Sequence, residues 1–396
     1  MRTVVRLLGA LALALLGACG SSAPDGGDNA EPLPHTDAPP APLRLAADRA
    51  GLRWGAAVSA QPLREDADYR ALAAGQFNTL TTENALKFSV VQPAPGVYDF
   101  RDADLIAAFA RAHGQKLRGH VLVWHNQLPD WLASGTFTRD ELIALMRDYI
   151  HTVLGHFRRH HADVVLEWDV VNEAFEADGS RRPSIWQRVI GDDYVELAFR
   201  FAHEAWPGLP LYYNDFEENT FVILESKIAL DGSPQLTRPS GIGATPLLSD
   251  CGLIPKCAAI RDLATTLVAA GVPIHGIGWQ AHIASVAAPD YQKLSEWIEP
   301  LGLRWALTEL DAPCPLGPLD DATCHALQAQ TFASAARDCI ESPACDTVIQ
   351  WGVHDGYTWW PGLSFGLFGE ALAFDADGQP KPAAAALLPL FEAAAR

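Results

Sequence analysis

The 396-residue sequence predicts an α/β fold, a (β/α)8 TIM barrel formed by a single domain. Three observations support this prediction. Hydrophobic residues make up 49% of the chain and charged residues 19%, which is enough apolar material for one large core. Short runs of strand-forming residues alternate with longer segments of helical period. Nearly every run ends in polar or aromatic residues, as expected where the carboxyl ends of barrel strands form a functional face.

Eight short runs have the length and composition of strands, and the segments between them have the apolar spacing of amphipathic helices. The strands are expected at 52–58, 77–83, 117–124, 165–173, 210–215, 275–282, 304–310 and 347–354. Helices are expected at 101–113, 138–160, 192–205, 258–270, 290–300, 322–341 and 382–395, among others. Thr138 and Glu141 match a capping box at the start of the longest helix. No internal repeat or second domain is visible, so residues 43–396 are assigned to one domain.

The segment before this domain has the pattern of an export signal. Arg2 and Arg6 supply a positive amino-terminal region, and the apolar run assigned to 4–16 is too short to span a bilayer and then anchor. Leu16-Gly17-Ala18-Cys19 resembles a bacterial lipobox, in which Cys19 would be lipidated; ordinary secretion is the alternative. We expect a lipoprotein signal peptide over 1–18 and a flexible tether over 19–42. The protein would then be lipid-anchored at the cell envelope (outer membrane or cell surface), or otherwise secreted.

Six further cysteines lie in the predicted domain. An even number in an exported chain favours disulfides. Spacing favours pairing between neighbours, although the sequence alone leaves the connectivity open; the pairs would be Cys251–Cys257, Cys314–Cys324 and Cys339–Cys345. A zinc site is the competing interpretation, and the absence of a Cys-x-x-Cys pair disfavours it.

The charge balance limits the partners. Lys and Arg total 29 and Asp and Glu total 48, giving a net charge of −19. This argues against nucleic acid and against anionic membrane surfaces, but is compatible with a neutral polymer. The twelve tryptophans either fill cores or form flat apolar faces on which sugars stack. No phosphate-cradling glycine loop is present and the first strand lacks a His-x-His pair, so we expect no cofactor and no metal. We expect a monomer.

Two glutamates carry the expected chemistry. Glu173 ends the fourth predicted strand and Glu309 ends the seventh, so they would face each other across the barrel mouth. A facing carboxylate pair is what glycoside hydrolysis requires, because one acid protonates the leaving oxygen and the other carboxylate attacks or activates water. A single strand-end glutamate is more often a rim residue or an ion-pair partner. The polar neighbours Asn172 and Asp311 favour a catalytic pair.

Seven motifs between about Trp54 and Pro382 resemble, in order, those of glycoside hydrolase family 10, the endo-β-1,4-xylanases. They are Phe77-Asn78-x-x-Thr81-x-Glu83-Asn84-x-x-Lys87, Arg118-Gly119-His120-x-Leu122-Val123-Trp124-His125-x-Gln127-Leu128-Pro129-x-Trp131, Trp168-Asp169-Val170-Val171-Asn172-Glu173-Ala174, Tyr213-Asn214-Asp215, Gly276-x-Gly278-x-Gln280-x-His282, Thr308-Glu309-Leu310-Asp311 and Trp351-Gly352-x-x-Asp355.

The resemblance implies a retaining endo-β-1,4-xylanase that cleaves internal β-1,4-xylosidic bonds of xylan or xylo-oligosaccharides by double displacement. Glu173 would be the general acid/base and Glu309 the nucleophile. His282 and Asp311 would orient Glu309 and tune its charge. The substrate contacts implied are Asn172 at the sugar 2-OH, Glu83, Asn84, Lys87, His120, Trp124 and Gln280 on the glycone side, Trp351 and Trp359 over the sugar, and Tyr213 and Asn214 toward the aglycone.

Alternatives remain at this stage. A related two-glutamate barrel could act on mannan or cellulose, and a surface lipoprotein could bind glycans without cleaving them. The segment 221–257 is longer than the family norm and either reshapes the aglycone subsites or is a surface insertion. Lys87 is well placed for an ion pair with Glu83. The Arg181–Arg182 pair is expected on a solvated loop. If the backbone is extended at Trp359–Trp360, only one of the two indoles can face the sugar.

Overall fold

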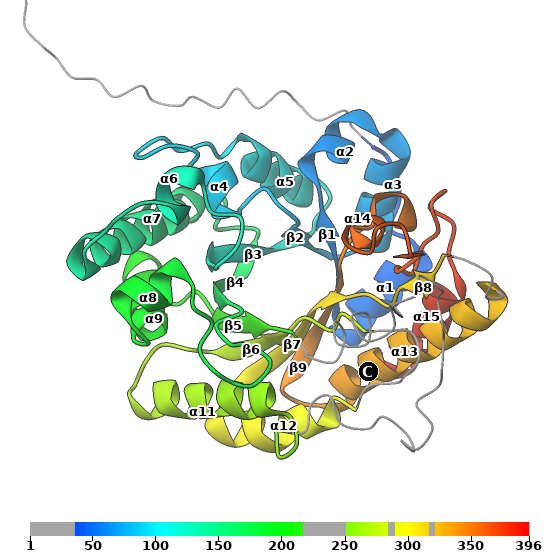
Figure 1. The fold of residues 1–396 in the computed structure, drawn as a ribbon. Helices are drawn as coiled ribbons and strands as arrows, with labels where there is room; N and C mark the ends of the chain where they lie inside the picture. Colours follow the sequence, from blue (N-terminus) through cyan, green and yellow to red (C-terminus); the bar gives the residue numbers. More distant parts are fainter. Residues whose placement is uncertain (1–35, 217–250, 284–289, 317–320, 396) are drawn as a thin grey trace, which may run out of the picture. The chain divides into compact units, whose positions relative to one another are not determined.

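Eight parallel strands form a closed barrel in the computed structural model, which describes residues 36–216, 251–283, 290–316 and 321–395 (Figure 1). The barrel order is β1 (Arg53–Val58), β2 (Thr79–Thr82), β3 (Lys116–Val123), β4 (Val165–Asn172), β5 (Leu211–Asp215), β6 (Gly276–Trp279), β7 (Arg304–Leu310) and β9 (Cys345–Gln350). The sheet closes because β1 pairs with both β2 and β9. Each strand overlaps one predicted run, so the predicted (β/α)8 barrel is confirmed.

Helices surround the barrel (Figure 1). In chain order they are α1 (Pro42–Ala50), α2 (Ala60–Glu65), α3 (Ala67–Gln76), α4 (Phe88–Val91), α5 (Arg101–Ala112), α6 (Asp130–Ala133), α7 (Arg139–His160), α8 (Ile185–Ile190), α9 (Tyr194–Ala205), α11 (Pro255–Ala269), α12 (Gln292–Ile298), α13 (Asp321–Glu341), α14 (Trp360–Leu363) and α15 (Pro382–Ala394). A short antiparallel pair, β8 (Cys314–Pro315) with β10 (Phe368–Gly369), stands apart from the barrel sheet.

The long helices begin and end close to their predicted bounds. The capping box on α7 is present, because Thr138 Oγ1 accepts from the Glu141 N–H and the Glu141 carboxylate accepts from the Thr138 N–H. The short helices α2, α4, α6 and α8 were not predicted, since they are too brief to show a clear period. Helix α1 begins at Pro42, and the N–H of Ala41 already donates to the Gly75 carbonyl.

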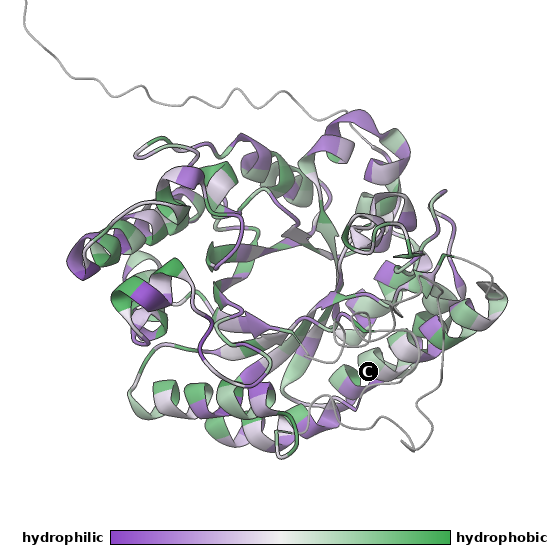
Figure 2. Ribbon diagram, in the orientation of Figure 1, coloured by the Kyte–Doolittle hydropathy of each residue, from purple (hydrophilic) through white to green (hydrophobic). Residues whose placement is uncertain are grey.

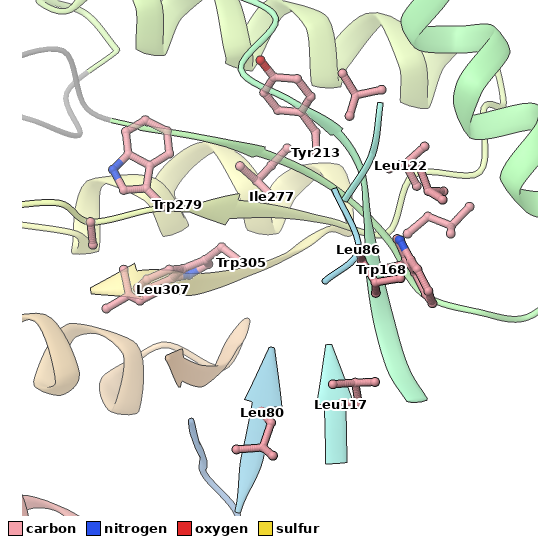
Figure 3. Packing of buried hydrophobic residues seen from close by; sticks show 14 of the residues in the cluster. Leu80, Leu86, Leu117, Leu122, Trp168, Tyr213, Ile277, Trp279, Trp305 and Leu307 are labelled. Carbon is pink, nitrogen blue, oxygen red and sulfur yellow. The ribbon is translucent and has the colours of Figure 1, made fainter. Parts of the chain in front are cut away.

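The core lies in the barrel and between the barrel and its helices. The surrounding helices carry hydrophobic and hydrophilic residues in alternation, as amphipathic helices do (Figure 2). Trp54, Trp168, Trp279 and Trp305 fill the core and are at most 1% exposed, whereas Trp206 is only partly buried. Figure 3 shows several of these side chains packed together. Among the described residues, no helix combines the length and the apolar character needed to cross a bilayer.

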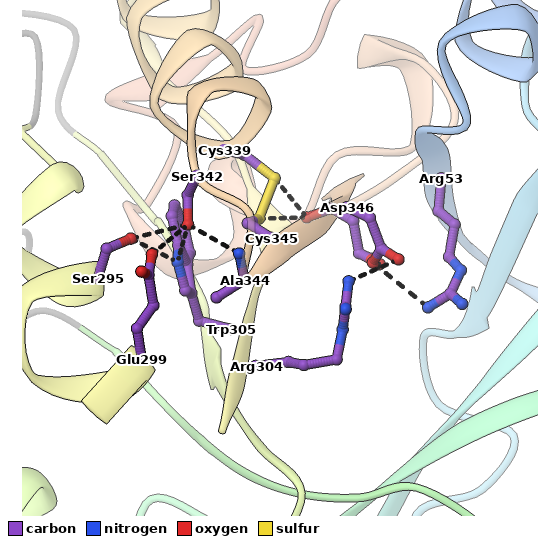
Figure 4. The surroundings of a disulfide bond; sticks show 11 residues. Arg53, Ser295, Glu299, Arg304, Trp305, Cys339, Ser342, Ala344, Cys345 and Asp346 are labelled. Atoms are coloured by element: carbon purple, nitrogen blue, oxygen red, sulfur yellow. Dashed lines mark hydrogen bonds and ion pairs between the residues drawn. A yellow bond between two sulfur atoms is a disulfide. The ribbon is translucent and has the colours of Figure 1, made fainter. Parts of the chain in front are cut away.

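Charge pairs join the amino ends of β1, β7 and β9, and a disulfide ties α13 to the start of β9 (Figure 4). Cys339 at the end of α13 is bonded to Cys345 at the start of β9. Asp346 pairs with Arg53 at 3.4 Å and with Arg304 at 2.7 Å. Contacts at the amino ends of the strands serve stability in such a barrel, because the active site lies at the carboxyl ends. The disulfides Cys251–Cys257 and Cys314–Cys324 also form, so all three predicted neighbour pairings are confirmed.

The predicted signal peptide over 1–18 and most of the predicted tether over 19–42 lie outside the described residues. The same holds for most of the segment 221–257, of which only 251–257 is described.

Candidate active site

A cleft of about 520 Å³ opens where the carboxyl ends of the barrel strands meet. Twelve of the fifteen residues predicted for the site line it: Glu83, Asn84, Lys87, His120, Trp124, Asn172, Glu173, Gln280, His282, Glu309, Trp351 and Trp359. Five further lining residues were not predicted: Asn126, Gln127, Arg182, Phe216 and Leu363. The remaining three predicted residues, Tyr213, Asn214 and Asp311, do not line the cleft.

Side-chain amides join the two glutamates. Asn214 Nδ2 donates to Glu309 Oε1 at 2.8 Å and to Asn172 Oδ1 at 2.9 Å, and Asn172 Nδ2 donates to Glu173 Oε1 at 3.1 Å. Thr308 Oγ1 donates to Asn214 Oδ1 at 2.7 Å, which fixes the orientation of that amide. Gln280 Nε2 provides a second donor to Glu173 Oε1, at 3.0 Å. The barrel therefore brings both carboxylates into one hydrogen-bonded network, as the sequence predicted.

Glu309 is held as a carboxylate by positive charge. Burial alone would raise its pKa, but the hydrogen bond from His282 and the charges of His120, His282 and Lys87 outweigh burial and lower the pKa. His282 Nε2 lies 3.2 Å from Glu309 Oε2, and its Nδ1 lies 3.0 Å from Asp311 Oδ1. Burial opposes the charge on His282, yet these two carboxylates raise its pKa to about 10. His282 is therefore an imidazolium at neutral pH, placed between two acids.

The backbone at Glu173 is strained and held from several sides. Its φ is +55°, a left-handed value that a non-glycine residue rarely adopts. The Glu173 N–H donates to the Asn214 carbonyl at 2.9 Å, and its carbonyl accepts from Arg182 Nε at 3.0 Å. The expectation that Arg182 lies on a solvated loop is wrong, because its guanidinium binds the main chain around Glu173 and lines the cleft. Loop residues have no period from which such a contact could be predicted.

A neutral imidazole lies beside the Glu173 side chain. His125 Nδ1 is 3.7 Å from Glu173 Oε2, and burial lowers the pKa of His125 to about 4 despite this carboxylate. Above about pH 4, His125 is therefore neutral and adds no positive charge beside Glu173. The two glutamates thus lie in different settings: Glu309 contacts an imidazolium, whereas Glu173 contacts amides and a neutral ring.

Lys87 is fully inside the cleft wall. Its Nζ lies 2.7 Å from His120 Nε2 and 4.2 Å from the centre of the Trp124 ring. Burial lowers the pKa of Lys87 to about 8, against the attraction of Glu309 and other carboxylates. Lys87 and Glu83 are both described, and no ion pair within 4.0 Å joins them, so that prediction is wrong. The Lys87 amine instead contacts His120, and its positive charge helps to lower the pKa of Glu309.

A buried arginine supports this wall from inside the barrel. Arg118 forms ion pairs with Asp169 and Glu167, and its guanidinium lies 4.5 Å from the Tyr212 ring centre. Asp169 Oδ2 lies 3.1 Å from His120 Nδ1, so the His120 ring can donate to Asp169 and accept from the Lys87 amine. Asp169 stands in the motif that contains Glu173, but no role for Asp169 was predicted from the sequence.

Two indoles form the aromatic side of the cleft. The Trp351 ring meets the His120 ring edge-on at 5.3 Å. Trp359 Nε1 donates to Asp311 Oδ2 at 2.8 Å, so the same acid holds both His282 and this indole. Trp360 is fully buried in a small separate cluster. Only Trp359 of the adjacent pair lines the cleft, as predicted, although the reason is that helix α14 begins there and not that the backbone is extended.

The three predicted site residues outside the cleft act through their neighbours. Asp311 holds His282 and Trp359, and Asn214 bridges Glu309 and Asn172. Tyr213 is fully buried, and its hydroxyl accepts from the Ala174 N–H at 2.9 Å. Its expected contact with the aglycone is therefore corrected, because the ring faces the protein interior.

Two groups of three metal-binding side chains occur among the described residues, and neither contributes to the cleft. In one, Cys314 is consumed by its disulfide. In the other, Asp104 Oδ1 accepts from His156 and His161, while Arg111 donates to His161 Nδ1. This places the His161 proton on Nε2, the atom that a metal would need. The group is better suited to hold Asp104 as a carboxylate than to bind an ion.

Comparison with known proteins identifies the family. The sequence model described as glycosyl hydrolase family 10 matches residues 42–228 and 251–389. The chain belongs to this family. Endo-1,4-beta-xylanase B of Thermotoga neapolitana is 33% identical over 357 residues, covering 89% of this chain and 92% of the relative. Endo-1,4-beta-xylanase 5 of Pyricularia oryzae is 32% identical over 358 residues, covering 89% and 79%.

Solved structures of the family share the fold. Xylanase 10B from Thermotoga petrophila in complex with xylobiose has a TM-score of 0.76 and 32% identity, covering 92% of this chain and all of that one. Native xylanase 10B from Thermotoga maritima has a TM-score of 0.75 at 32% identity, covering 89% and 98%. The family match omits residues 229–250, which lie within the segment identified as longer than the family norm.

Proposed function

We propose that this glycoside hydrolase is a retaining endo-β-1,4-xylanase that acts as a monomer on xylan or xylo-oligosaccharides. The observation that carries the proposal is the network that joins two carboxylates with different neighbours across the cleft. An imidazolium and a lysine favour the charged form of Glu309, as a nucleophile needs, whereas the neighbours of Glu173 are amides and a neutral histidine. The relatives named as endo-1,4-beta-xylanases support xylan as the substrate.

The reaction would proceed in two displacements. In the first, Glu309 attacks the anomeric carbon while Glu173 transfers its proton to the glycosidic oxygen, so that the aglycone leaves with a new hydroxyl group. In the second, Glu173 takes a proton from water, the resulting oxygen attacks the anomeric carbon, and the bond to Glu309 breaks. The β configuration is retained, and both glutamates return to their initial states.

The remaining groups would serve the charge that develops on the sugar ring. Asn172 lies between the two glutamates, where its amide can bind the 2-OH of the reacting sugar, a contact that strengthens in the transition state. Trp351 and Trp359 supply apolar surface on one side of the cleft, and the Lys87 amine, held by His120, supplies donors. No cofactor enters this scheme.

Proton NMR of soluble xylan during the first minutes of digestion by residues 43–396 tests the proposal. New β-anomeric reducing ends are expected. New α-anomeric ends would overturn retention, and absence of cleavage would overturn xylan as the substrate, with glucan and mannan to be tried next. Glu173→Gln should lose far more activity on xylan than on activated aryl glycosides, because only the poor leaving group needs a proton. Equal losses would contradict the acid/base assignment.

We also propose that the enzyme is exported and lipid-anchored through Cys19 at the cell envelope. The support is the Leu16-Gly17-Ala18-Cys19 sequence after a short apolar run. Lipid on a mature N-terminal Cys19, measured by mass spectrometry of the membrane fraction, is the expected result. Cys19→Ser should release the protein from that fraction. A protein processed elsewhere and recovered only in the medium would contradict the anchor.

We propose that an enzyme anchored at the cell envelope acts on oligosaccharides delivered to the cell surface. Rates on xylohexaose and on polymeric xylan compare the two substrates. A strong preference for insoluble polymer would contradict this part of the proposal.

A further inference from the structure

A buried chain of polar contacts leads from the main chain beside Glu173 away from the cleft. The Ala174 N–H donates to the Tyr213 hydroxyl at 2.9 Å, and that hydroxyl donates to Asp215 Oδ2 at 2.5 Å. Lys256 Nζ lies 2.8 Å from Asp215 Oδ1. The Lys256 and Asp215 side chains are 1% and 0% exposed, and Tyr213 is fully buried. Burial and Asp215 raise the pKa of Tyr213 well above its usual value, so the hydroxyl keeps its proton.

A buried ion pair of this kind is weak support for stability, because desolvation offsets the attraction between the charges. Its geometry is specific, however. Asp215 fixes the Tyr213 hydroxyl, and that hydroxyl fixes the peptide that follows Glu173, the residue with the strained φ of +55°. A strained catalytic residue persists only when its surroundings hold it in place.

Lys256 reaches this position from a distant part of the chain. It is the second residue of α11, and the next residue, Cys257, is bonded to Cys251. The turn after Glu173 also packs on this helix start, because a Cβ added at Gly179 would lie only 2.8 Å from the Pro255 carbonyl oxygen. The disulfide therefore closes a short loop over 251–257 that carries Lys256, and the start of α11 packs against the loop after Glu173.

The pair also cancels charge near the acid/base. Several charged and titratable groups face Glu173: Lys87 just before α4, His125 after β3, Arg182 on the loop after β4, Asp215 on β5 and Lys256 on α11. Burial raises the pKa of Asp215, with Lys256 opposing and Glu173 adding to that rise. Without Lys256, the cation that offsets Asp215 would be lost, so the pKa of Asp215 would rise further and its negative charge would act on Glu173 at the alkaline pH where it is ionised.

We propose that Tyr213, Asp215 and Lys256 are positioning residues that hold Glu173 in its working orientation and keep a neutral ion pair behind it. The inference rests on the proposed function, because it assigns a partner to the general acid/base. It goes beyond that function by extending the site to α11 and its disulfide. It also gives Tyr213 a role in place of the substrate contact that the sequence suggested.

Lys256→Met tests the electrostatic part. We expect kcat/KM on soluble xylan to fall about ten- to hundredfold, the scale of a small misplacement at a reacting centre. Hydrolysis of a dinitrophenyl xylobioside should fall less than about threefold, because its leaving group needs no proton. The alkaline limb of the kcat/KM profile on xylan should move to higher pH, since the Asp215 charge opposes proton loss from Glu173. Adding Asp215→Asn to Lys256→Met should return that limb toward its wild-type position.

Tyr213→Phe tests the geometric part and covers the case in which Lys256→Met does not fold. It should lower activity on xylan and spare the aryl glycoside, but leave the alkaline limb in place, because the ion pair remains. Lys116→Met, at the exposed start of β3, is the control and should match the wild type. Melting curves show which variants are folded.

The outcomes separate the two proposals. A wild-type enzyme that does not cleave xylan overturns the proposed function. The positioning role alone is overturned if the wild type is active but folded variants lose activity on xylan and on the aryl glycoside equally. It is also overturned if folded Lys256→Met keeps the wild-type alkaline limb.

Discussion

Lys87 allows a quantitative test of the conflict between stability and function in the cleft. Its side chain is 3% exposed, and burial lowers its pKa to about 8 from the usual 10.5. At about 1.4 kcal/mol for each tenfold change in proton affinity, this difference corresponds to about 3 kcal/mol of cost to the folded state. Methionine has a similar length and no charge. Losing the Lys87–His120 hydrogen bond should cost about 1 kcal/mol. The folded state of Lys87→Met should therefore be more stable than that of the wild type by about 2 kcal/mol at pH 7.

The pH dependence follows from the same two values. Below pH 8 Lys87 is charged in both states, and the folded state bears the full cost. Between pH 8 and 10.5 the unfolded chain keeps a proton that the folded protein has lost, so wild-type stability rises relative to the variant. The advantage of Lys87→Met should therefore shrink across this window and reverse above it, where only the loss of the His120 contact, about 1 kcal/mol, remains. Other groups that titrate there are common to both proteins and cancel in the difference.

Urea unfolding followed by tryptophan fluorescence at pH 7, 8.5 and 10 measures this difference, with the disulfides kept oxidised. Activity of Lys87→Met should fall, since the amine faces His120 and the nucleophile. The exposed Lys116→Met control should stay within about 0.5 kcal/mol of the wild type at every pH. A variant less stable than the wild type at pH 7, or a gap that does not change with pH, would refute the reasoning.

Two further predictions follow from buried carboxylates. Asp311→Asn should lower the charge on His282, so Glu309 will take up a proton more readily and the acid limb of kcat/KM will move to higher pH; an unmoved limb would contradict the ion triad. Asp104→Asn should destabilise the protein by roughly 1–2 kcal/mol at pH 6, because burial is outweighed by two histidines that lower the pKa of Asp104 to about 2. That loss should fade as the pH falls from 4 toward 2, and exposed Asp102→Asn, on the same helix, should show no such trend in urea unfolding.

Much of the site could be predicted because it repeats one local pattern, a polar residue at a strand end. Glu173 and Glu309 were found in this way, as were Gln280 and Trp351. The family resemblance misplaced Tyr213, because successive residues of a strand point to opposite faces and the motif alone does not say which face is the cleft.

The partners of these residues could not be predicted from local patterns. Arg182 comes from a loop without periodicity, and Phe216 follows a strand end as an ordinary apolar residue. Lys87 has an acid four residues earlier, but in the folded chain its amine lies against His120 and Trp124 instead. Such contacts depend on the three-dimensional path of several segments.

The sequence by itself determined the eight strands, the long helices and the two glutamates, because each depends on spacing within a few residues or on position at a strand end. It favoured disulfides between neighbouring cysteines, and the structure fixed that pairing. Only the tertiary structure decided which amide joins Glu309 to Asn172, what lowers the pKa of Lys87 and what stands behind Glu173. Barrel closure brings together side chains far apart in the chain, and burial then sets the strength of their charges. Neither effect can be predicted from the spacing of neighbouring residues, so both are seen only in the folded protein.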